Sequence, residues 1–153
     1  GTGTPVTVSN LQAGSELAWY LMDTSRAIKP LIYQERKAPE FVSMTRVDDE
    51  VVFTSGEYRY GVDLRANAGF GIWQMAYKSK AALTPENYAA ARAAMMTLKA
   101  DGGRPLGLRP TVLVVPPQLE AQARAIVGVQ LAAGGGTNPW FGTAEVIVTP
   151  YLG

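Results

Sequence analysis

The sequence predicts an α+β protein, and three stretches of the chain support this class. Thr84–Gly103 has the residue pattern of a helix, alternating apolar residues between Tyr58 and Leu64 indicate a half-buried strand, and the β-branched run Thr111–Val115 indicates a buried strand. A chain of 153 residues fits one domain that buries most of the surface exposed by the unfolded chain.

The composition argues against most enzyme classes. The chain has no cysteine and no histidine, so it lacks thiolate metal ligands and the commonest general base. Fourteen basic residues balance thirteen acidic residues, without the basic cluster expected of a nucleic-acid-binding protein. Apolar runs are too short to span a membrane, and the first residues lack a signal-peptide pattern. We therefore expect a soluble, catalytically inert protein with no cofactor and no metal.

The first third of the chain predicts short strands. Residues 1–16 contain a weak strand around the sequence VTV and a loop, and Leu17–Met22 is a short apolar run typical of a buried strand. Two further strands are expected at Leu31–Gln34 and Glu40–Met44. They are separated by Pro39, which cannot donate to a ladder hydrogen bond.

The middle of the chain predicts a two-stranded antiparallel ribbon. Val47–Glu50 is expected to form a turn, and a strand follows from Val51. Its apolar and charged residues fall on opposite faces: Tyr58, Tyr60, Val62 and Leu64 on one, and Arg59, Asp63 and Arg65 on the other. Residues 65–69 (RANAG) offer Asn and Gly for a hairpin loop, after which Phe70–Tyr77 would return as the second strand.

The helix at Thr84 has clear start and stop signals. Thr84 is a good N-cap, Pro85 suits the first helical position, and the glycines at 102 and 103 suit its end after Lys99. Its apolar stripe consists of Tyr88, Ala91, Met95 and Leu98. This stripe is expected to pack on the apolar face of the ribbon that contains Tyr60 and Trp73.

The last third of the chain predicts a strand, a helix and a strand. The strand Thr111–Val115 precedes a helix that begins at Pro116–Pro117 and ends at Val127. A flexible loop covers residues 134–142, and Ala144–Thr149 is the last strand.

Four groups of residues could carry chemistry, and each has a simpler reading. The acidic run Asp48–Glu50 could bind a metal but fits a solvated turn better, and Gly134–Thr137 could cradle a phosphate but lacks the P-loop order. Arg59 and Arg65 could bind an anion or form a charged outer face. The aromatic pair at residues 140 and 141 could be a contact surface or fold back onto the core.

Five blocks of the sequence resemble one known family. They are WYLMDTSRAIKPLIYQERKAPEFVSMT, YGVDLRANAGFGIWQMAY, LTPENYAAARAAMM, GRPLGLRPTVLVVPPQLEAQA and GGTNPWFGTAEVIVTPYL. They are similar to the Mu-like major head subunits of tailed phages and prophages, which have the Hong Kong 97-type capsid fold. The resemblance implies a long spine helix at Thr84–Lys99 and a long β-ribbon. It also implies an axial-like part at residues 11–34 and 104–153 and a peripheral-like part at residues 35–103.

The order of these blocks differs from the order that the resemblance implies. The spine-helix and axial blocks are expected before the WYLMD and YGVD blocks, whereas here they follow them. This indicates a circular permutation, with the N-terminal arm and the extended loop missing. On this interpretation Val146–Leu152 and Leu17–Met22 are expected to lie close together in one sheet, and the isolated chain is expected to form monomers or weak oligomers rather than shells.

The resemblance implies a structural function without catalytic, cofactor-binding or metal-binding residues. The chain is expected to self-associate into capsomers of a phage head, with other head proteins as further candidate partners, and to be part of a virion made in the bacterial cytoplasm. No membrane and no sequence-specific nucleic acid are expected as partners. Possible subunit contacts are Arg59, Arg65, Asn67, Asn138 and Trp140. The alternatives are a small-ligand or anion-binding module that uses the Gly134–Gly136 loop and the helix near Pro117, and a carboxylate hydrolase that uses Asp48, Asp49 and Asp63.

Overall fold

The computed structural model describes residues 9–46, 48–132 and 134–152 and divides them into two compact units. The sheet unit comprises residues 9–30 and 71–152, and the ribbon unit comprises Leu31–Phe70. Both helices and strands are present, so the predicted α+β class is confirmed. The weak strand expected around VTV, at residues 6–8, lies outside the described residues.

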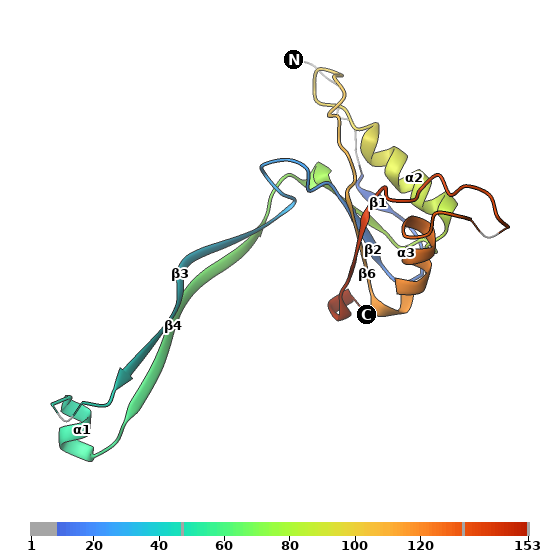
Figure 1. Ribbon diagram of the computed structural model, residues 1–153. Helices are drawn as coiled ribbons and strands as arrows, with labels where there is room; N and C mark the ends of the chain where they lie inside the picture. Colours follow the sequence, from blue (N-terminus) through green and yellow to red (C-terminus); the bar gives the residue numbers. More distant parts are fainter. Residues whose placement is uncertain (1–8, 47, 133, 153) are drawn as a thin grey trace. The chain divides into compact units, whose positions relative to one another are not determined.

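The sheet unit is built on a mixed sheet with the strand order β1-β5-β2-β6-β7 (Figure 1). Its strands are β1 (Leu11–Gln12), β2 (Trp19–Met22), β5 (Ala76–Ser79), β6 (Val112–Val115) and β7 (Glu145–Val148). β2 is antiparallel to both of its neighbours, whereas β1 is parallel to β5 and β6 is parallel to β7. The strands expected near residues 17–22, 111–115 and 144–149 are therefore confirmed.

The helix expected after Thr84 is confirmed, but it ends earlier than the sequence predicts. α2 spans Pro85–Met96, and the Thr84 Oγ1 accepts a hydrogen bond from the Asn87 amide at 3.3 Å. Thr97 ends the helix, because the following chain folds into a small hairpin in which the Leu106 amide donates to the Leu98 carbonyl at 2.9 Å.

The second predicted helix is present as two short consecutive helices. Pro117–Leu119 forms the 3-10 helix η2, and α3 continues over Glu120–Val127. The prolines fit this start, since the first amides of a helix have no partner within it.

The core of the sheet unit lies between α2, α3 and one face of the sheet. Its buried residues are Trp19, Leu21, Tyr77, Leu83, Tyr88, Ala91, Met95, Leu113, Val115, Ala123, Ile126 and Val127. The predicted packing of the α2 stripe on the ribbon is therefore wrong, because the stripe packs against the strands of the sheet unit. Tyr60, its expected partner, belongs to the ribbon unit, and Trp73 is 47% exposed in η1 (Trp73–Met75).

The ribbon unit is a two-stranded antiparallel sheet, but its strands are not the predicted ones. β3 spans Leu31–Met44 and β4 spans Arg59–Phe70. The two short strands expected before and after Pro39 form one strand, because the proline falls at a register irregularity between Lys37 and Glu40, where no ladder amide is needed.

The chain reverses at residues 45–58 rather than at residues 65–69. Glu50–Ser55 forms the helix α1, so the strand expected from Val51 is wrong, and Gly56 ends the helix with φ +68°. RANAG is extended within β4, since none of these five residues has a positive φ. Phe70–Tyr77 does not return along the ribbon, because β5 pairs with β2 in the sheet unit.

The boundaries of the two compact units differ from the predicted boundaries between the axial-like and peripheral-like parts. Residues 71–103 contain β5 and α2 and belong to the sheet unit. The predicted boundaries grouped this whole segment with the ribbon. The axial and peripheral assignment itself stays a prediction.

Candidate functional site: the apolar face of the ribbon

The ribbon unit has one strongly apolar face. In an antiparallel pair, residues directly opposite each other project to the same face, and alternate residues along each strand share it. Leu31 lies opposite Phe70, and Phe41 lies opposite Val62. The apolar ribbon face therefore comprises the large side chains of Leu31, Tyr33, Phe41, Tyr60, Val62, Leu64 and Phe70.

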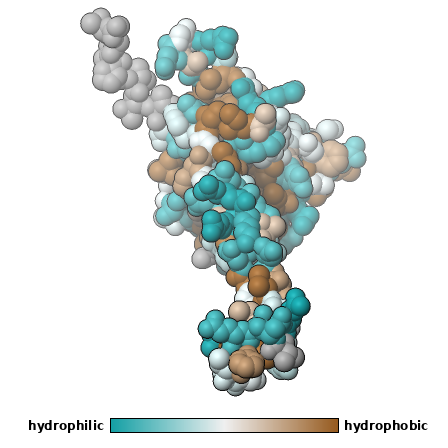
Figure 2. Space-filling view, turned by 90° about the vertical axis from the view of Figure 1, so that its left-hand side faces the viewer, coloured by the Kyte–Doolittle hydropathy of each residue, from teal (hydrophilic) through white to brown (hydrophobic). Residues whose placement is uncertain are grey.

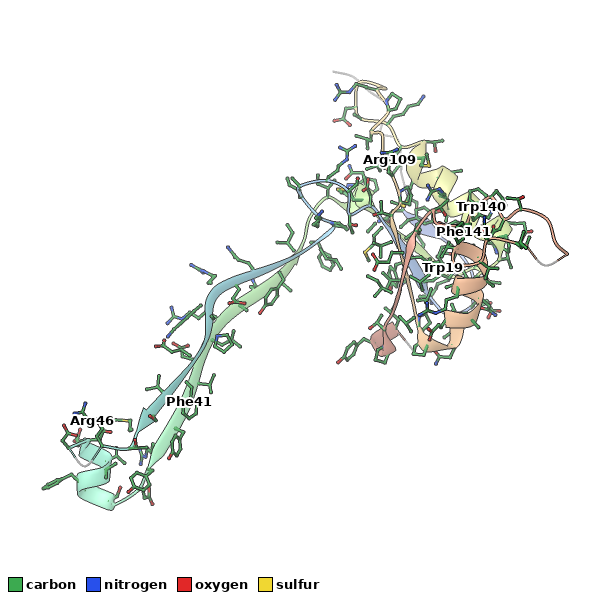
Figure 3. All side chains as sticks on the ribbon, viewed as in Figure 1. Trp19, Phe41, Arg46, Arg109, Trp140 and Phe141 are labelled. Carbon is green, nitrogen blue, oxygen red and sulfur yellow. The ribbon has the colours of Figure 1, made fainter. Side chains whose placement is uncertain are left out.

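The large residues of this face are solvent-exposed. Their exposed fractions range from 51% at Leu64 to 89% at Phe70. The rings of Phe41 and Tyr60 stack on each other with centroids 5.7 Å apart, which shields only part of each ring. Figure 3 labels Phe41 on β3, and Figure 2 shows hydrophobic residues, in brown, among hydrophilic residues at the surface.

The opposite face of the ribbon carries its charged and amide side chains, with three large apolar residues, Ile32, Val42 and Met44, among them. Lys37 Nζ lies 2.7 Å from Asp63 Oδ2 and 3.0 Å from Glu40 Oε2. The hydrogen bond to Asp63, and then the one to Glu40, raises the pKa of Lys37 above its ordinary value. Arg59, Asp63, Arg65 and Asn67 alternate along this face of β4. All of these side chains are exposed or half-exposed, so the ion pairs contribute little to stability.

Within the described residues, the ribbon unit has no second layer of secondary structure that covers its apolar face. A two-stranded sheet is marginally stable in water by itself, whereas burying a large apolar side chain stabilises a fold by roughly 1.5–3 kcal/mol. Contiguous apolar patches of this kind mark contact surfaces in folded proteins. The apolar ribbon face can therefore act as a packing surface for another body.

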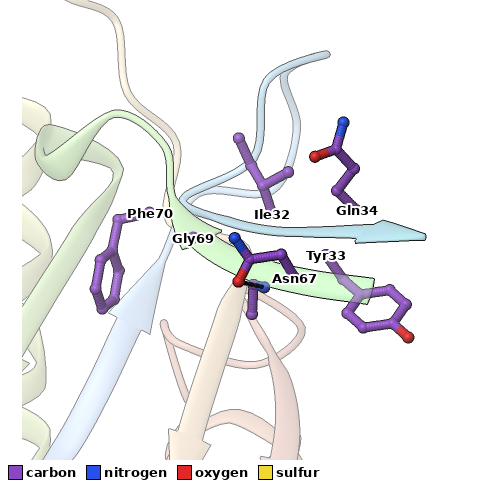
Figure 4. A pocket seen from close by; sticks show the side chains of 7 residues that line it. Ile32, Tyr33, Gln34, Asn67, Gly69 and Phe70 are labelled. Carbon is purple, nitrogen blue, oxygen red and sulfur yellow. Dashed lines mark hydrogen bonds between the residues drawn. The ribbon is translucent and has the colours of Figure 1, made fainter. Parts of the chain in front are cut away.

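A hollow of about 400 Å³ lies on the ribbon near the ends of β3 and β4 (Figure 4). It is lined by Ile32, Tyr33, Gln34, Asn67, Ala68, Gly69 and Phe70. The Asn67 Oδ1 accepts a hydrogen bond from the Ala68 amide at 3.0 Å, which holds the side chain along the strand. The lining contains no ionisable carboxylate or amine, so it suits packing better than catalysis.

The five candidate contact residues lie in different units. Arg59, Arg65 and Asn67 are exposed on the polar face of β4. Asn138 is buried in the sheet unit, where its Nδ2 donates to the carbonyls of Ile126 and Val129, at 2.7 Å in each case.

Trp140, the fifth candidate, folds back onto the core rather than standing free. Its ring meets the Tyr88 ring edge to face, with centroids 5.7 Å apart, and its amide donates to the Asn138 Oδ1 at 3.0 Å. Phe141, beside it, is 49% exposed. The contact role of all five candidates stays a prediction, and the geometry gives Asn138 and Trp140 a structural role as well.

The acidic run beside α1 is engaged in a turn. Asp48 Oδ1 lies 3.4 Å from Arg46 Nε, and Asp49 Oδ2 accepts a hydrogen bond from the Arg46 amide at 3.0 Å. Among the residues that the structure describes, no group of three or more acidic side chains is placed to hold a metal ion. This matches the solvated-turn interpretation of the sequence.

The glycine loop is also closed by its own backbone. The Gly135 amide donates to the Ala132 carbonyl at 3.0 Å, and the Ala132 amide donates to the Gly136 carbonyl at 2.7 Å. Gly134 and Gly135 adopt φ values of +107° and +85°, which explains the glycines without a ligand.

No described helix is long and apolar enough to span a membrane.

Sequence reasoning found only half of the apolar ribbon face. It placed Tyr60, Val62 and Leu64 on one face of a strand but paired that strand with residues 70–77. The missing half comes from Leu31 and Phe41, whose alternation is interrupted by the irregularity around Pro39. The period of two within Leu31–Gln34 and within Glu40–Met44 was the available signal.

An α+β unit combined with an uncovered, one-sided apolar ribbon is typical of a structural protein that functions by packing against other protein surfaces. The chain belongs to the family of Mu-like prophage major head subunits (gpT), whose model matches residues 1–152. Curated relatives agree with this assignment. The chain is 43% identical over 158 residues to the major capsid protein of Escherichia phage Mu. This alignment covers 99% of this chain and 52% of the relative.

A second relative and several solved structures are also similar. The Mu-like prophage FluMu major head subunit of Haemophilus influenzae is 48% identical over 119 residues, covering 78% of this chain and 39% of the relative. A chain of the procapsid of bacteriophage JBD30 superposes with a TM-score of 0.84 at 54% identity, covering 99% of this chain and 52% of that chain. A chain of the JBD30 capsid superposes with a TM-score of 0.76 at 28% identity, covering 100% of this chain and 52% of that chain. The predicted capsid fold is thereby confirmed.

The chain spans about half of the length of the phage Mu relative and less than half of the length of the Haemophilus influenzae relative. The match to the phage Mu protein is a single alignment over 99% of this chain, whereas a permuted chain is expected to match in two separate blocks. The inferred permutation therefore finds no support. The expected proximity of its two strands is confirmed, since β2 and β7 flank β6, about 10 Å apart. That proximity holds for any chain order that builds this sheet.

Proposed function

We propose that the chain is the part of a phage major head subunit that contributes the mixed sheet and the ribbon to the capsid shell. Family membership gives the class of protein, and the exposed apolar ribbon face is the observation that carries the mechanism. Shell formation requires surfaces that are stable only when covered by neighbouring protein. A face with seven exposed large apolar residues meets that requirement.

The work of such a subunit is self-association rather than catalysis. The geometry that supports this view is the engagement of Asp48 and Asp49 in a turn and of Asn138 in backbone hydrogen bonds. We propose that neighbouring copies cover the apolar ribbon face in the assembled head. The protein would then be made in the bacterial cytoplasm and end in the virion, with other head proteins as further partners.

A pair of valines on opposite faces of the ribbon tests this proposal. Val62 lies on the apolar ribbon face and is 65% exposed, whereas Val42 lies on the polar face and is 50% exposed. Val62→Asp in β4 and Val42→Asp in β3 introduce the same charge into opposite faces of the ribbon. Each is introduced into the head subunit that contains this chain, and shells are counted by negative-stain electron microscopy and sedimentation.

Val62→Asp is expected to reduce the yield of shells by at least tenfold, because a carboxylate would be buried without a partner. Val42→Asp is expected to assemble nearly as well as the unsubstituted subunit. Circular dichroism and thermal melting establish that both subunits are folded. Equal assembly of the two variants would contradict a contact role of the apolar ribbon face.

A further inference from the structure

The sheet unit carries its positive charge unevenly. Five of its nine basic residues lie in two loops, residues 23–30 and 98–110, and all five are exposed. We call them the basic loop surface: Arg26, Lys29, Lys99, Arg104 and Arg109. The same loops contain two acidic residues, of which Asp23 is buried and Asp101 is exposed.

The fold brings these two loops together, although the hydrogen bonds that join them connect residues 80 or more positions apart in the chain. Arg26 reaches across, and its Nη2 donates to the carbonyls of Leu106 and Gly107. Asp23 Oδ2 accepts a hydrogen bond from the Arg109 amide at 2.8 Å, and the Thr24 amide donates to Thr111 Oγ1 at 3.0 Å. The basic loop surface is therefore a property of the tertiary structure, since neither segment alone forms a basic run.

The second loop folds back on itself as a small hairpin after α2 (Figure 1), and its three cations are exposed. Lys99 pairs with Pro105 in an antiparallel bridge, and the Ala100 amide donates to the Arg104 carbonyl at 2.8 Å. Gly103 closes the turn with φ +78°. Figure 3 labels Arg109 where this loop returns to the sheet unit.

We propose that the basic loop surface binds the phosphate backbone of nucleic acid without reading its sequence. Cations dominate such binding, and neither loop contains an aromatic residue to stack on bases or an asparagine or glutamine to read adenine. This activity is separate from the shell contacts proposed above, because the apolar ribbon face contributes nothing to it.

The favoured partner is a polyphosphate rather than an acidic protein. Three of the five cations are arginines, whose planar guanidinium group suits phosphate oxygens, and the loops expose only one large apolar side chain, Ile28, to anchor a protein interface. Arg26 and Lys29 also donate to backbone carbonyls, and when all five cations contact phosphates the logarithm of the binding constant falls with the logarithm of salt concentration with a slope of about −4.5. Between 50 and 200 mM salt, binding would weaken roughly 500-fold.

The test measures binding of a fluorescent 30-base-pair DNA duplex by anisotropy over this salt range. Arg104→Ala is expected to weaken binding at every salt concentration and to make the slope shallower by about 0.9. Arg36→Ala removes an exposed arginine from the ribbon unit and serves as the matched control, with binding and slope unchanged. Two duplexes of unrelated sequence are expected to bind equally.

Three outcomes would overturn the proposal. Equal weakening by Arg104→Ala and Arg36→Ala would show that only net charge matters. A slope near zero would show that phosphates are not the ligand. Competition by polyglutamate as effective as competition by unlabelled duplex would assign the surface to an acidic protein instead. None of these outcomes bears on shell assembly, so this proposal and the proposed function can fail separately.

Discussion

Phe41 lies directly opposite Val62 across the β3–β4 ribbon, and about two-thirds of each residue is exposed, 66% and 65% respectively. Directly opposed apolar side chains of an antiparallel pair are normally part of a core. In the ribbon unit the Phe41 ring stacks on the Tyr60 ring, but no second layer among the unit's described residues covers the pair. The ribbon therefore carries one side of an apolar contact, and the proposed function depends on which protein surface covers that side.

The apolar stripe of α2 provides a first prediction, on the stability of the sheet unit. Met95→Ala is expected to lower the free energy of unfolding by about 2–5 kcal/mol, because Met95 is fully buried between the helix and the sheet. The neighbouring Met96 is 46% exposed, so Met96→Ala is the control and should change stability by less than about 1 kcal/mol. Urea denaturation followed by circular dichroism measures both. Similar losses for the two variants would contradict the observed orientation of α2.

Asn138 allows a second prediction, on the C-terminal end of α3. Asn138→Ala leaves the carbonyls of Ile126 and Val129 without their side-chain donor and is expected to cost about 1–3 kcal/mol. Asn67→Ala, at an exposed position of the ribbon, should cost less than about 0.5 kcal/mol. Thermal unfolding ranks the two variants. A neutral Asn138→Ala would mean that the amide does not hold this part of the chain.

Gly14 supports a third prediction, on a close backbone contact. A Cβ atom at Gly14 would lie 2.0 Å from the Lys80 carbonyl oxygen, so Gly14→Ala must displace backbone and is expected to cost about 1–3 kcal/mol. Gly136→Ala is the matched control, because its Cβ would meet no heavy atom within 4 Å. The difference in melting temperature between the two variants checks this. A tolerated Gly14→Ala would show that the loop before β2 does not pack on residue 80.

The buried carboxylate of Asp23 predicts how stability depends on pH. Burial alone raises the pKa of this group, but hydrogen bonds from the Arg109 amide and from the Ser25 hydroxyl and amide outweigh burial and lower the pKa below its ordinary value of 3.8. A lowered folded-state pKa contributes stability that is fully present above the unfolded pKa and is lost as the pH falls through the folded pKa.

Asp23→Asn is therefore expected to be less stable than the unsubstituted protein at neutral pH and to approach it as the pH falls below about 4. Urea unfolding between pH 3 and pH 7 measures the difference. A difference that stayed constant over this range would show that the ionised carboxylate does not join the two loops.

Local signals in the sequence were enough to predict much of the sheet unit. Thr84 and Pro85 define the start of α2, and the prolines at 116 and 117 define the next helix, because capping and fixed φ values act within a few residues. The end of α2 was missed, since the hairpin after Thr97 depends on hydrogen bonds to residues 104–106.

The ribbon was harder to predict because its pairing is not local. RANAG has the composition of a turn, yet it is extended because Ile32–Glu35 and Lys37 pair with it. The true reversal lies at α1, where the acidic run resembled a simple turn. The basic loop surface was missed for a related reason: charge counts along the chain cannot show that residues 26 and 104 belong to neighbouring loops.

The accessibility of residue 62 before and after assembly tests the central claim most directly. This chain contains no cysteine, so Val62→Cys and Val42→Cys each add one thiol to it, on opposite faces of the ribbon, and labelling is located to this chain by mass spectrometry of its peptides. The measurement is the rate of maleimide labelling in dispersed subunits and in shells. The account predicts that assembly slows labelling at residue 62 at least tenfold and leaves the rate at residue 42 nearly unchanged. Equal rates at residue 62 in shells and in dispersed subunits would contradict it.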